Sequence, residues 1–335
     1  MNLTETVSNI AFGGEGVLRH EGKVVFVPFV LPGEQIEFKI TQSKKSHAFG
    51  SLLRVLKTHP DRVTPKCEYY GRCGGCQLQH ASYDLQLKIK QQFVEDALIR
   101  IGKLSNIQVN PIIGTNKQFS YRRRIKLHQQ GSQVGFIGVD GKSLVPITHC
   151  EIFSGQSLEI DPDIFVQAHP EQSERLYQDL VLAIQKLGTP KILDLYCGIG
   201  ILTAKLADIG CAITGIELNS KAIKYAKENH LQPVNWVTAD VAKVLASHLK
   251  RDQPEVVLVN PPRTGLSLEV TQILTQHKPK HIFYTSCMPA TLARDLKIFS
   301  EAGYSIDQCQ PYDLFPQTTH VETLVSLCLN SSKNF

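Results

Sequence analysis

Hydrophobic and polar residues alternate along the chain in two different ways. In the first 57 residues, short apolar stretches separated by glycines predict strands at 24–27, 35–40 and 51–55. From residue 171 onwards, apolar runs of strand type alternate with segments of helical period. The first pattern predicts a small OB-like β-barrel over residues 1–57, which could hold nucleic acid or be a structural appendage without a ligand.

The second pattern, over residues 171–335, is the more regular one. Strands are predicted at 191–196, 212–217, 234–240, 255–260 and 281–286, and two further strands around 304–309 and 323–329. Helices are expected between the strands, for example at 220–230 and 290–303. This alternation is typical of an α/β, Rossmann-like, doubly wound domain with a mostly parallel sheet.

Residues 58–170, between these two parts, are predicted to form a small β-rich central domain. A helix is expected at 85–100, and the alternation at Tyr121–His128 predicts a strand. Four basic or potentially basic side chains would then share one face of that strand, namely Arg122, Arg124, Lys126 and His128. Such a face could follow an RNA backbone or could simply be solvated, and the pattern leaves both readings open.

Composition and charge narrow the class of protein. A chain of 335 residues with 42% hydrophobic and 20% charged residues is typical of a soluble protein of two or three domains. The sequence has no run of 18 apolar residues and no apolar leader, so we expect no membrane contact, a cytoplasmic location and reduced cysteines. The net charge of +5 permits nucleic acid as a partner without requiring it.

The carboxyl ends of the predicted strands carry candidate ligand-binding residues, because open α/β sheets bind ligands there. The first strand leads into a loop with Gly198 and Gly200, but Thr203 stands where a nicotinamide-binding loop has its third glycine. Glu217 ends the second strand, in place to bind ribose hydroxyls, and Asp240 ends the third, in place to bind an adenine amino group. This combination favours S-adenosylmethionine over a dinucleotide.

Cysteines form a second candidate site. Cys67, Cys73 and Cys76 have the spacing C-x5-C-x2-C, and Cys150 follows at a distance. Four thiolates could hold zinc or an iron–sulfur cluster. The spacing does not fit the C-x3-C-x2-C of radical enzymes. Four further cysteines lie in or beside apolar strands and are expected to be core residues, namely Cys197, Cys211, Cys309 and Cys328.

Four motifs together resemble the motif series of the RNA uridine-5 methyltransferases: Asp194–Gly200, Asn260–Arg263, Ser286–Pro289 and Phe315–Glu322. The resemblance covers nearly the whole chain. It implies a TRAM domain, an OB-like RNA-binding module, at the N-terminus. It also implies that Cys67, Cys73, Cys76 and Cys150 hold a [4Fe–4S] cluster, as in the members that act on 23S ribosomal RNA.

The resemblance also implies a site for S-adenosylmethionine. Phe165–Gln167 is similar to the glutamine-containing motif that helps to bind the methyl donor in this family. The residues expected to contact the donor are Gln167, Tyr196, Gly198, Gly200, Ile201, Glu217, Asp240 and Asn260.

The chemistry of carbon 5 in uracil explains why such an enzyme needs a cysteine and a base. The ring is electron-poor, so a thiolate must first add to carbon 6 and create an enolate whose carbon 5 can attack a methyl group. A base must then remove the carbon 5 proton so that the thiol can leave. Cys287, at a strand end before a helix, is the expected nucleophile. The resemblance implies Glu322 as the base.

Three positions depart from the family pattern. Asn260 replaces an aspartate, Ile201 replaces a frequent asparagine, and Met288 replaces the asparagine that more commonly follows the cysteine. Asn-Pro-Pro also begins a motif of RNA amino-methyltransferases, although their fourth residue is aromatic and this chain has Arg263. A catalytically weak RNA-binding relative is the other alternative.

RNA is the expected partner in each case. Because the barrel and the cysteine cluster resemble accessories of the ribosomal RNA enzymes, 23S ribosomal RNA is favoured over transfer RNA. The protein is expected to act as a monomer.

Overall fold

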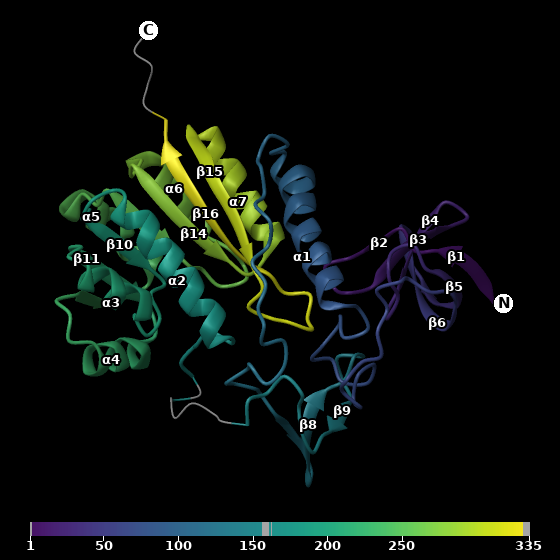
Figure 1. Ribbon diagram of the computed structural model, residues 1–335. Helices are drawn as coiled ribbons and strands as arrows, with labels where there is room; N and C mark the ends of the chain where they lie inside the picture. The colour runs from purple at the N-terminus through teal and green to yellow at the C-terminus, as the bar shows by residue number, and fades with distance from the viewer. Residues whose placement is uncertain (1, 156–160, 162, 331–335) are drawn as a thin grey trace. The chain divides into compact units, whose positions relative to one another are not determined.

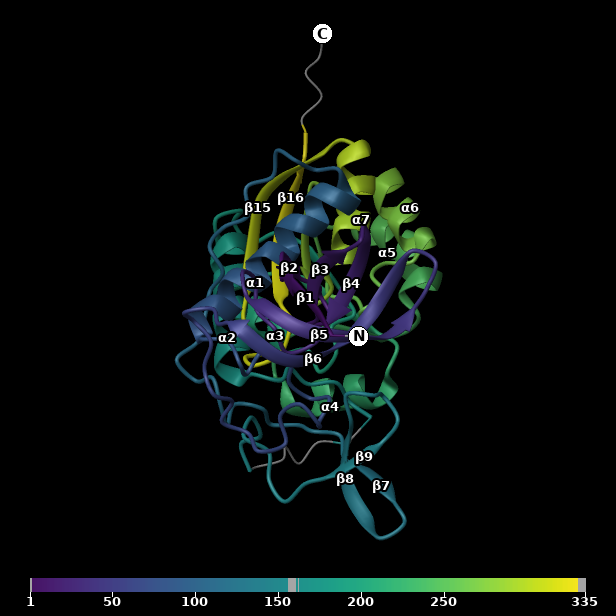
Figure 2. The same cartoon turned by 90° about the vertical axis from the view of Figure 1, so that its right-hand side faces the viewer.

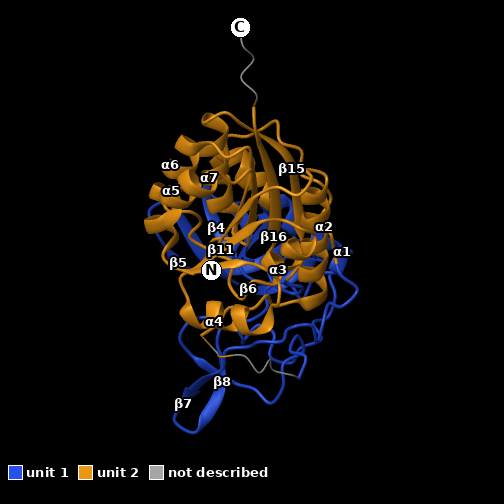
Figure 3. Ribbon diagram, turned by 90° about the vertical axis from the view of Figure 1, so that its left-hand side faces the viewer, with its two compact units in different colours: residues 1–93, 115–157, 315–320 blue, residues 94–114, 158–314, 321–335 orange. Residues whose placement is uncertain are grey.

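The structure, a computed structural model, describes residues 2–155, 161 and 163–330. The chain forms two compact units, which are coloured separately in Figure 3. Unit 1 comprises residues 1–93, 115–157 and 315–320, and unit 2 comprises residues 94–114, 158–314 and 321–335.

A six-stranded sheet forms the N-terminal part of unit 1. Its strands are β1 (Leu3–Thr6), β2 (Asn9–Ile10), β3 (Gly16–His20), β4 (Lys23–Val27), β5 (Gln35–Ser43) and β6 (His47–Lys57), in the order β1-β5-β6-β4-β3-β2. Alternate residues such as Val25, Val27 and Phe38 point into a buried apolar core. The three strands predicted from the sequence are confirmed as β4, β5 and β6, and the short strands β1 to β3 are additional.

The rest of unit 1 contains the first part of α1 (Tyr83–Ala97) and a small three-stranded sheet. Helix α1 runs into the π-helical turn η1 (Leu98–Gly102), so the helix predicted at 85–100 is confirmed. The small sheet has the order β7-β8-β9, with β7 (His128–Gln130), β8 (Gln133–Ile137) and β9 (Leu144–Pro146), and is drawn at the lower edge of Figure 2.

The strand predicted at 121–128 is wrong. Arg122 forms a single isolated bridge with Phe153, and the first strand of this region begins only at His128. The physical reason lies in the side chain of Arg122, whose Nε donates a hydrogen bond to the carbonyl of Arg124 at 2.9 Å. This bond uses a carbonyl group that a neighbouring strand would need.

Unit 2 is built around a seven-stranded sheet with the order β12-β11-β10-β13-β14-β16-β15. Its parallel strands are β10 (Ile192–Leu195), β11 (Ile213–Glu217), β12 (Asn235–Thr238), β13 (Val256–Val259) and β14 (His281–Ser286). The antiparallel strands are β15 (Tyr304–Tyr312) and β16 (Glu322–Leu329). All seven strands predicted for this part of the chain are confirmed.

Helices cover this sheet, as Figure 1 shows. They are α2 (Pro170–Gln185), α3 (Ile201–Asp208), α4 (Ser220–Asn229), α5 (Val241–Asp252), α6 (Leu268–His277) and α7 (Pro289–Glu301). Apolar residues of α5, α6 and α7, such as Leu245, Leu274 and Leu296, form one core with the sheet. Every residue of β10 and β13 is buried, as expected for central parallel strands.

The strand order reverses between β10 and β13. After β10 the chain moves outward to β11 and β12, and it then returns to place β13 on the other side of β10. Ligands of open α/β sheets bind in the crevice at such a reversal point, beyond the carboxyl ends of the strands. Among the described residues, no helix has the length and apolarity needed to cross a membrane.

Candidate active site

Cys287 and Glu322 are brought together by the antiparallel pairing of β14 with β16. In this register Ser286 lies opposite Thr323. Because Cys287 directly follows Ser286 and Glu322 directly precedes Thr323, the register continued by one residue places Cys287 opposite Glu322. Glu322 begins β16, as the sequence predicted. The two candidate catalytic residues therefore meet at one end of the sheet, although they are far apart in the sequence.

Both residues lie where the charged form is disfavoured. Glu322 is only 2% exposed, and its burial raises the pKa of the carboxyl group to about 8. Cys287 is half-buried, and burial together with the charge of Glu322 raises the pKa of its thiol to about 11. At pH 7, without a substrate, the thiol is therefore protonated and so is most of the carboxyl group.

Arg263 acts on both groups in the opposite direction. Its guanidinium lowers the pKa of the Cys287 thiol through its charge and through a hydrogen bond. Its charge also lowers the pKa of Glu322. Sequence reasoning treated Arg263 only as the last residue of the Asn-Pro-Pro-Arg motif. Its position in the turn after a parallel strand was the available signal that it belongs to the site.

The loop after β10 depends on glycine. Gly198 and Gly200 have φ angles of +56° and +73°, which side chains other than glycine rarely adopt. A Cβ atom on Gly200 would lie 2.1 Å from the ring of Trp236 in β12, so only glycine lets the loop pass this ring. The sequence did not indicate this role of Trp236, because the pairing of β11 with β12 brings the ring under the loop.

Two acids lie at the carboxyl ends of β11 and β12, as predicted, with Glu217 as the last residue of β11 and Asp240 two residues after β12. Glu217 is oriented by backbone N–H groups, since Gly198 donates to its Oε2 at 3.2 Å and Asn219 donates to its Oε1 at 2.8 Å. Asp240 is the N-cap residue of α5 and accepts a hydrogen bond from the first turn of that helix. Burial, Asp240 and, more weakly, Glu217 raise the pKa of Tyr196 to about 12. Tyr196, Glu217 and Asp240 thus interact around the carboxyl ends of the strands.

Gln167 offers a buried hydrogen-bond acceptor to this region. Its Oε1 has no hydrogen-bond partner among the residues that the structure describes. The preceding Ile164 packs with Ile199 of the glycine loop in an apolar cluster to which Ile201 also contributes. Leaving a buried acceptor without a partner costs free energy. A bound molecule that donates a hydrogen bond to Gln167 would remove this cost.

Asn260 lies directly after β13 at the point where the sheet reverses. Its backbone N–H is 3.4 Å from the carbonyl oxygen of Leu195 at the end of β10, and the residue is half-buried. The side-chain amide of Asn260 is therefore next to the crevice in which a ligand of this sheet would bind.

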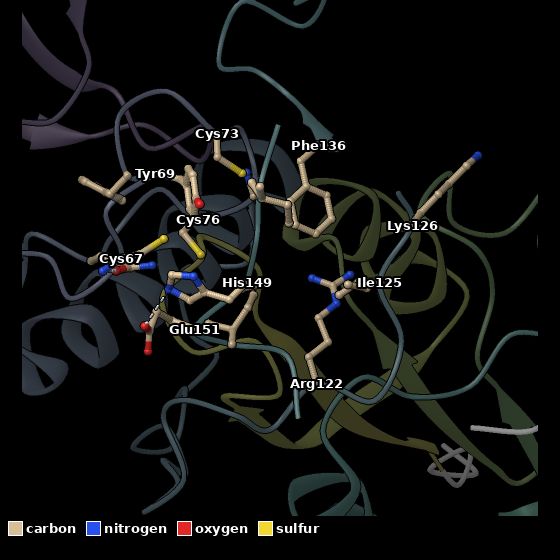
Figure 4. Close-up of a pocket in the computed structure, with 16 residues that line it drawn as sticks. Cys67, Tyr69, Cys73, Cys76, Arg122, Ile125, Lys126, Phe136, His149 and Glu151 are labelled. Carbon is tan, nitrogen blue, oxygen red and sulfur yellow. Dashed lines mark hydrogen bonds and ion pairs between the residues drawn. The ribbon is translucent and has the colours of Figure 1, made fainter. Parts of the chain in front are cut away.

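The four predicted metal-binding cysteines line one cavity in unit 1. This cavity has a volume of about 190 Å³, and Figure 4 shows Cys67, Cys73 and Cys76 beside it; Cys150 also lines it. Burial raises the pKa of the Cys76 thiol to about 12, and the other three cysteines contribute to this shift. Among the described residues, however, no three His, Cys, Asp or Glu side chains lie close enough to hold a metal ion.

Two of the predicted RNA-binding side chains line the same cavity. Arg122 and Lys126 are both part of its wall, and in Figure 4 the side chain of Lys126 points away from the cysteines. Lys126 is exposed, whereas Arg122 and Arg124 are half-buried. The basic residues therefore do not form the strand face that the sequence predicted, but two of them, Arg122 and Lys126, line the same cavity as the cysteines.

Three family models match the sequence. One described as tRNA (Uracil-5-)-methyltransferase matches residues 239–330, one described as Methyltransferase small domain matches residues 152–282, and the TRAM domain matches residues 5–53. The first of these matches contains Arg263, Cys287 and Glu322.

Relatives match the chain over almost its whole length. An uncharacterized RNA methyltransferase of Protochlamydia amoebophila is 36% identical, and the alignment covers 96% of this chain and 96% of the relative. An uncharacterized RNA methyltransferase of Aquifex aeolicus is 30% identical over 97% of this chain and 98% of the relative.

Among solved structures, the chain is similar to the tRNA (uracil-54, C5)-methyltransferase of Pyrococcus abyssi in complex with S-adenosyl-L-homocysteine. The TM-score is 0.77 at 23% identity, and the match covers 97% of this chain and 100% of the other. At this level of identity the similarity concerns the fold.

Proposed function

This chain belongs to the RNA methyltransferase family, and we propose that it transfers a methyl group from S-adenosylmethionine to carbon 5 of a uridine in RNA. The observation that carries this proposal is the register of β14 against β16, which, continued by one residue, brings Cys287 opposite Glu322. The charge of Glu322 raises the pKa of the Cys287 thiol, and the charge of Arg263 lowers the pKa of both groups. A thiol, a buried carboxyl group and a guanidinium are the groups that nucleophilic activation of a pyrimidine requires.

Cys287 acts as the nucleophile in this proposal. Its sulfur forms a bond to carbon 6 of the uracil, and the ring electrons move toward the carbonyl at carbon 4. The thiol must lose its proton for this step, and its raised pKa opposes that loss. Arg263 favours the loss of this proton, because its charge and its hydrogen bond to the sulfur lower the pKa of the thiol.

Glu322 acts as the base that completes the reaction. After carbon 5 has received the methyl group, the carboxylate removes the remaining carbon 5 proton, and the electron pair of that bond expels the Cys287 sulfur from carbon 6. A carboxylate whose conjugate acid has a pKa of about 8 is a stronger base than an exposed glutamate. Burial thus adapts Glu322 to proton abstraction from carbon.

The methyl donor would bind at the reversal point of the sheet. The residues that fit it include the unsatisfied acceptor of Gln167 for its amino group and the oriented carboxylate of Glu217 for its ribose. Asp240 and Tyr196 would face its adenine, and Asn260 would lie between the donor and the target base. Gly198, Gly200 and Ile201 would form a loop that lies along one side of the methyl donor. Bound there, the donor supplies the methyl group.

We also propose that the cysteine cavity holds a [4Fe–4S] cluster. The cavity is lined by four cysteines, and three of them raise the pKa of the fourth, Cys76. Four thiolates around one cavity are the ligand set that holds such a cluster.

Protein purified without oxygen is therefore expected to be brown and to contain about four irons per chain. Cys73→Ser should lose the iron but retain affinity for the methyl donor, because the donor residues belong to the other unit. Iron content and absorbance measure the first effect, and calorimetric titration with S-adenosylmethionine measures the second. Cys328→Ser, which alters a cysteine outside the cavity, is the control. A colourless protein with one zinc per chain would refute the cluster.

RNA binding is proposed to involve Arg122, Arg124 and Lys126. Lys126 offers the cleanest test, because its side chain is exposed whereas the guanidinium of Arg122 also bonds the backbone. Lys126→Ala should weaken RNA binding and reduce the slope of log affinity against log salt by about 1, as expected for the loss of one phosphate contact. Lys224→Ala on α4 is the charge-matched control. An unchanged salt slope for Lys126→Ala would contradict the contact.

The methylated nucleoside distinguishes the proposed reaction from its alternative. Total RNA is methylated with labelled donor and digested to nucleosides, and the label is expected in 5-methyluridine. We propose 23S ribosomal RNA as the substrate, so the label should be in ribosomal RNA rather than transfer RNA. Label in an N-methylated base would favour an amino-methyltransferase, to which Asn260 is suited, and no label would favour a catalytically weak RNA-binding protein.

A further inference from the structure

The turn that carries Arg263 needs support from elsewhere in unit 2. It links β13 with α6, and its residues 262–264 are exposed. An exposed turn of this kind can fluctuate, and the effect of Arg263 on the Cys287 thiol depends on the position of its guanidinium. The structure therefore raises the question of which groups hold the turn in place.

Three side chains of α7 hold this turn. They are spaced so that they share one face of the helix, at Thr291, Arg294 and Asp295. The Thr291 hydroxyl lies 3.1 Å from the carbonyl oxygen of Arg263 and 3.2 Å from that of Met288, and it can donate its proton to one of them at a time. Thr291 thus links the backbone of Arg263 to the residue that follows Cys287.

Arg294 and Asp295 bind the other half of the turn. Arg294 Nη2 donates to the carbonyl oxygen of Thr264 at 3.1 Å and to that of Leu266 at 3.0 Å. Asp295 Oδ2 accepts a hydrogen bond from the backbone N–H of Leu266 at 2.9 Å. Arg294 therefore binds backbone groups on both sides of Gly265 and Asp295 binds the backbone after it, and these contacts do not depend on the side chains of the turn.

Asp295 is a buried anchor for this arrangement. It is 1% exposed, and its carboxylate also accepts hydrogen bonds from Tyr284 Oη at 2.7 Å and from Arg294 Nε at 2.8 Å. Gly265 has a φ angle of +74°, and a Cβ atom there would lie 2.6 Å from Arg294 Nη2 and 2.7 Å from Asp295 Oδ2. The close approach of the two side chains to the turn thus requires glycine at this position.

These contacts connect the nucleophile and its cationic partner to the same helix. Helix α7 begins two residues after Cys287, and its first two turns hold the backbone of the Arg263 turn. We propose that Arg294 and Asp295 are positioning residues for the methyl transfer: they fix the turn so that Arg263 remains beside the Cys287 sulfur. This inference rests on the proposed function, in which Cys287 is the nucleophile.

The reactivity of the Cys287 thiol in RNA-free protein tests this inference. The rate of alkylation of Cys287 by iodoacetamide is measured against pH, with the modified peptide identified by mass spectrometry. Arg263→Gln and Arg294→Gln are each expected to slow alkylation at pH 8 roughly three- to tenfold and to move the profile to higher pH, because the thiolate loses cationic support. The double variant should show no additional shift, because Arg294 acts only through Arg263.

Arg251→Gln is the matched control, because Arg251 on α5 also pairs with the aspartate that follows it, Asp252. Its alkylation profile should equal that of the unmodified protein. If Arg294→Gln does not fold, Thr291→Val removes only one hydroxyl and should shift the profile in the same direction by a smaller amount. An unchanged alkylation profile in folded Arg294→Gln overturns the inference. If Arg294→Gln does not fold, an unchanged profile in Thr291→Val overturns it. If the profile shifts in Arg294→Gln but the unmodified protein does not methylate RNA, the proposed function is refuted and the support of the turn by α7 still stands.

Discussion

Replacing Cys287 by alanine is expected to abolish methylation of RNA. Without a thiolate at carbon 6, carbon 5 of uracil does not become nucleophilic, so the expected loss is roughly 10⁴-fold or more, the order found when a covalent nucleophile is removed. Transfer of a labelled methyl group to RNA under single-turnover conditions measures this effect. The variant should also form no covalent adduct with RNA.

Affinity for the methyl donor should remain in Cys287→Ala, because none of the candidate donor-binding residues is changed. Cys328→Ala, which alters another half-buried cysteine of the same sheet, is the control and should methylate normally. Methylation by Cys287→Ala at more than a few per cent of the normal rate would mean that another group is the nucleophile.

Glu322→Gln is expected to give the opposite phenotype with respect to the adduct. The variant can still attack carbon 6 and accept the methyl group at carbon 5, but it cannot remove the carbon 5 proton. Turnover should fall by roughly 10²–10⁴-fold, the range for loss of a general base. A covalent species of protein and RNA should accumulate and survive denaturant on a gel. Normal turnover in Glu322→Gln would mean that another residue is the base. Glu301→Gln, at the exposed end of α7, is the control and should turn over normally.

The raised pKa of Glu322 adds a dependence on pH to this prediction. Because both the base and the nucleophile must be ionised, turnover of the unmodified protein should rise more steeply with pH below about 8 than above it. Glu322→Gln should keep only the gentler rise that comes from ionisation of the Cys287 thiol. The free energy of unfolding of the unmodified protein should fall as pH rises, whereas its turnover increases. The folded pKa lies above the unfolded value of 4.5, so the unmodified protein loses stability as pH rises from about 4.5 to about 8. Thermal unfolding should therefore show Glu322→Gln gaining stability relative to the unmodified protein over this range, by roughly 2 kcal/mol or more at pH 8.

The fold of unit 2 could be predicted from the sequence because its central strands are mostly apolar runs. Strands buried on both faces, such as β10 and β13, are apolar at nearly every position, Asp194 in β10 being an exception, and helices of a different period separate them. The candidate donor residues could be predicted for a related reason. Glu217 is the last residue of β11 and Asp240 comes two residues after β12, and parallel strands bring their carboxyl ends to one edge of the sheet.

Local pattern alone could not predict how Cys287 and Glu322 meet. Their approach depends on β16 lying between β14 and β15 in a particular antiparallel register, which is a property of the whole sheet. Only the resemblance to a family indicated Glu322. The alternation of polar and apolar side chains at Tyr121–His128 predicted a strand that the structure does not contain. The side chain of Arg122 donates a hydrogen bond to the carbonyl of Arg124, and the pattern of side chains does not indicate this contact with the backbone. Helix α7 supports the Arg263 turn through hydrogen bonds to backbone atoms. The pattern of polar and apolar residues in the sequence does not predict such contacts.

Release of tritium from RNA made with [5-³H]uridine shows whether the methyl group is attached to carbon 5. Methylation at carbon 5 must remove the hydrogen from that carbon, and methylation of an amine leaves it in place. With S-adenosylmethionine present, the account predicts one tritium released for each methyl group transferred, with no release by Cys287→Ala. Methyl transfer to RNA without release of tritium would contradict the account, because the methyl group would then have been attached elsewhere than to carbon 5 of uridine.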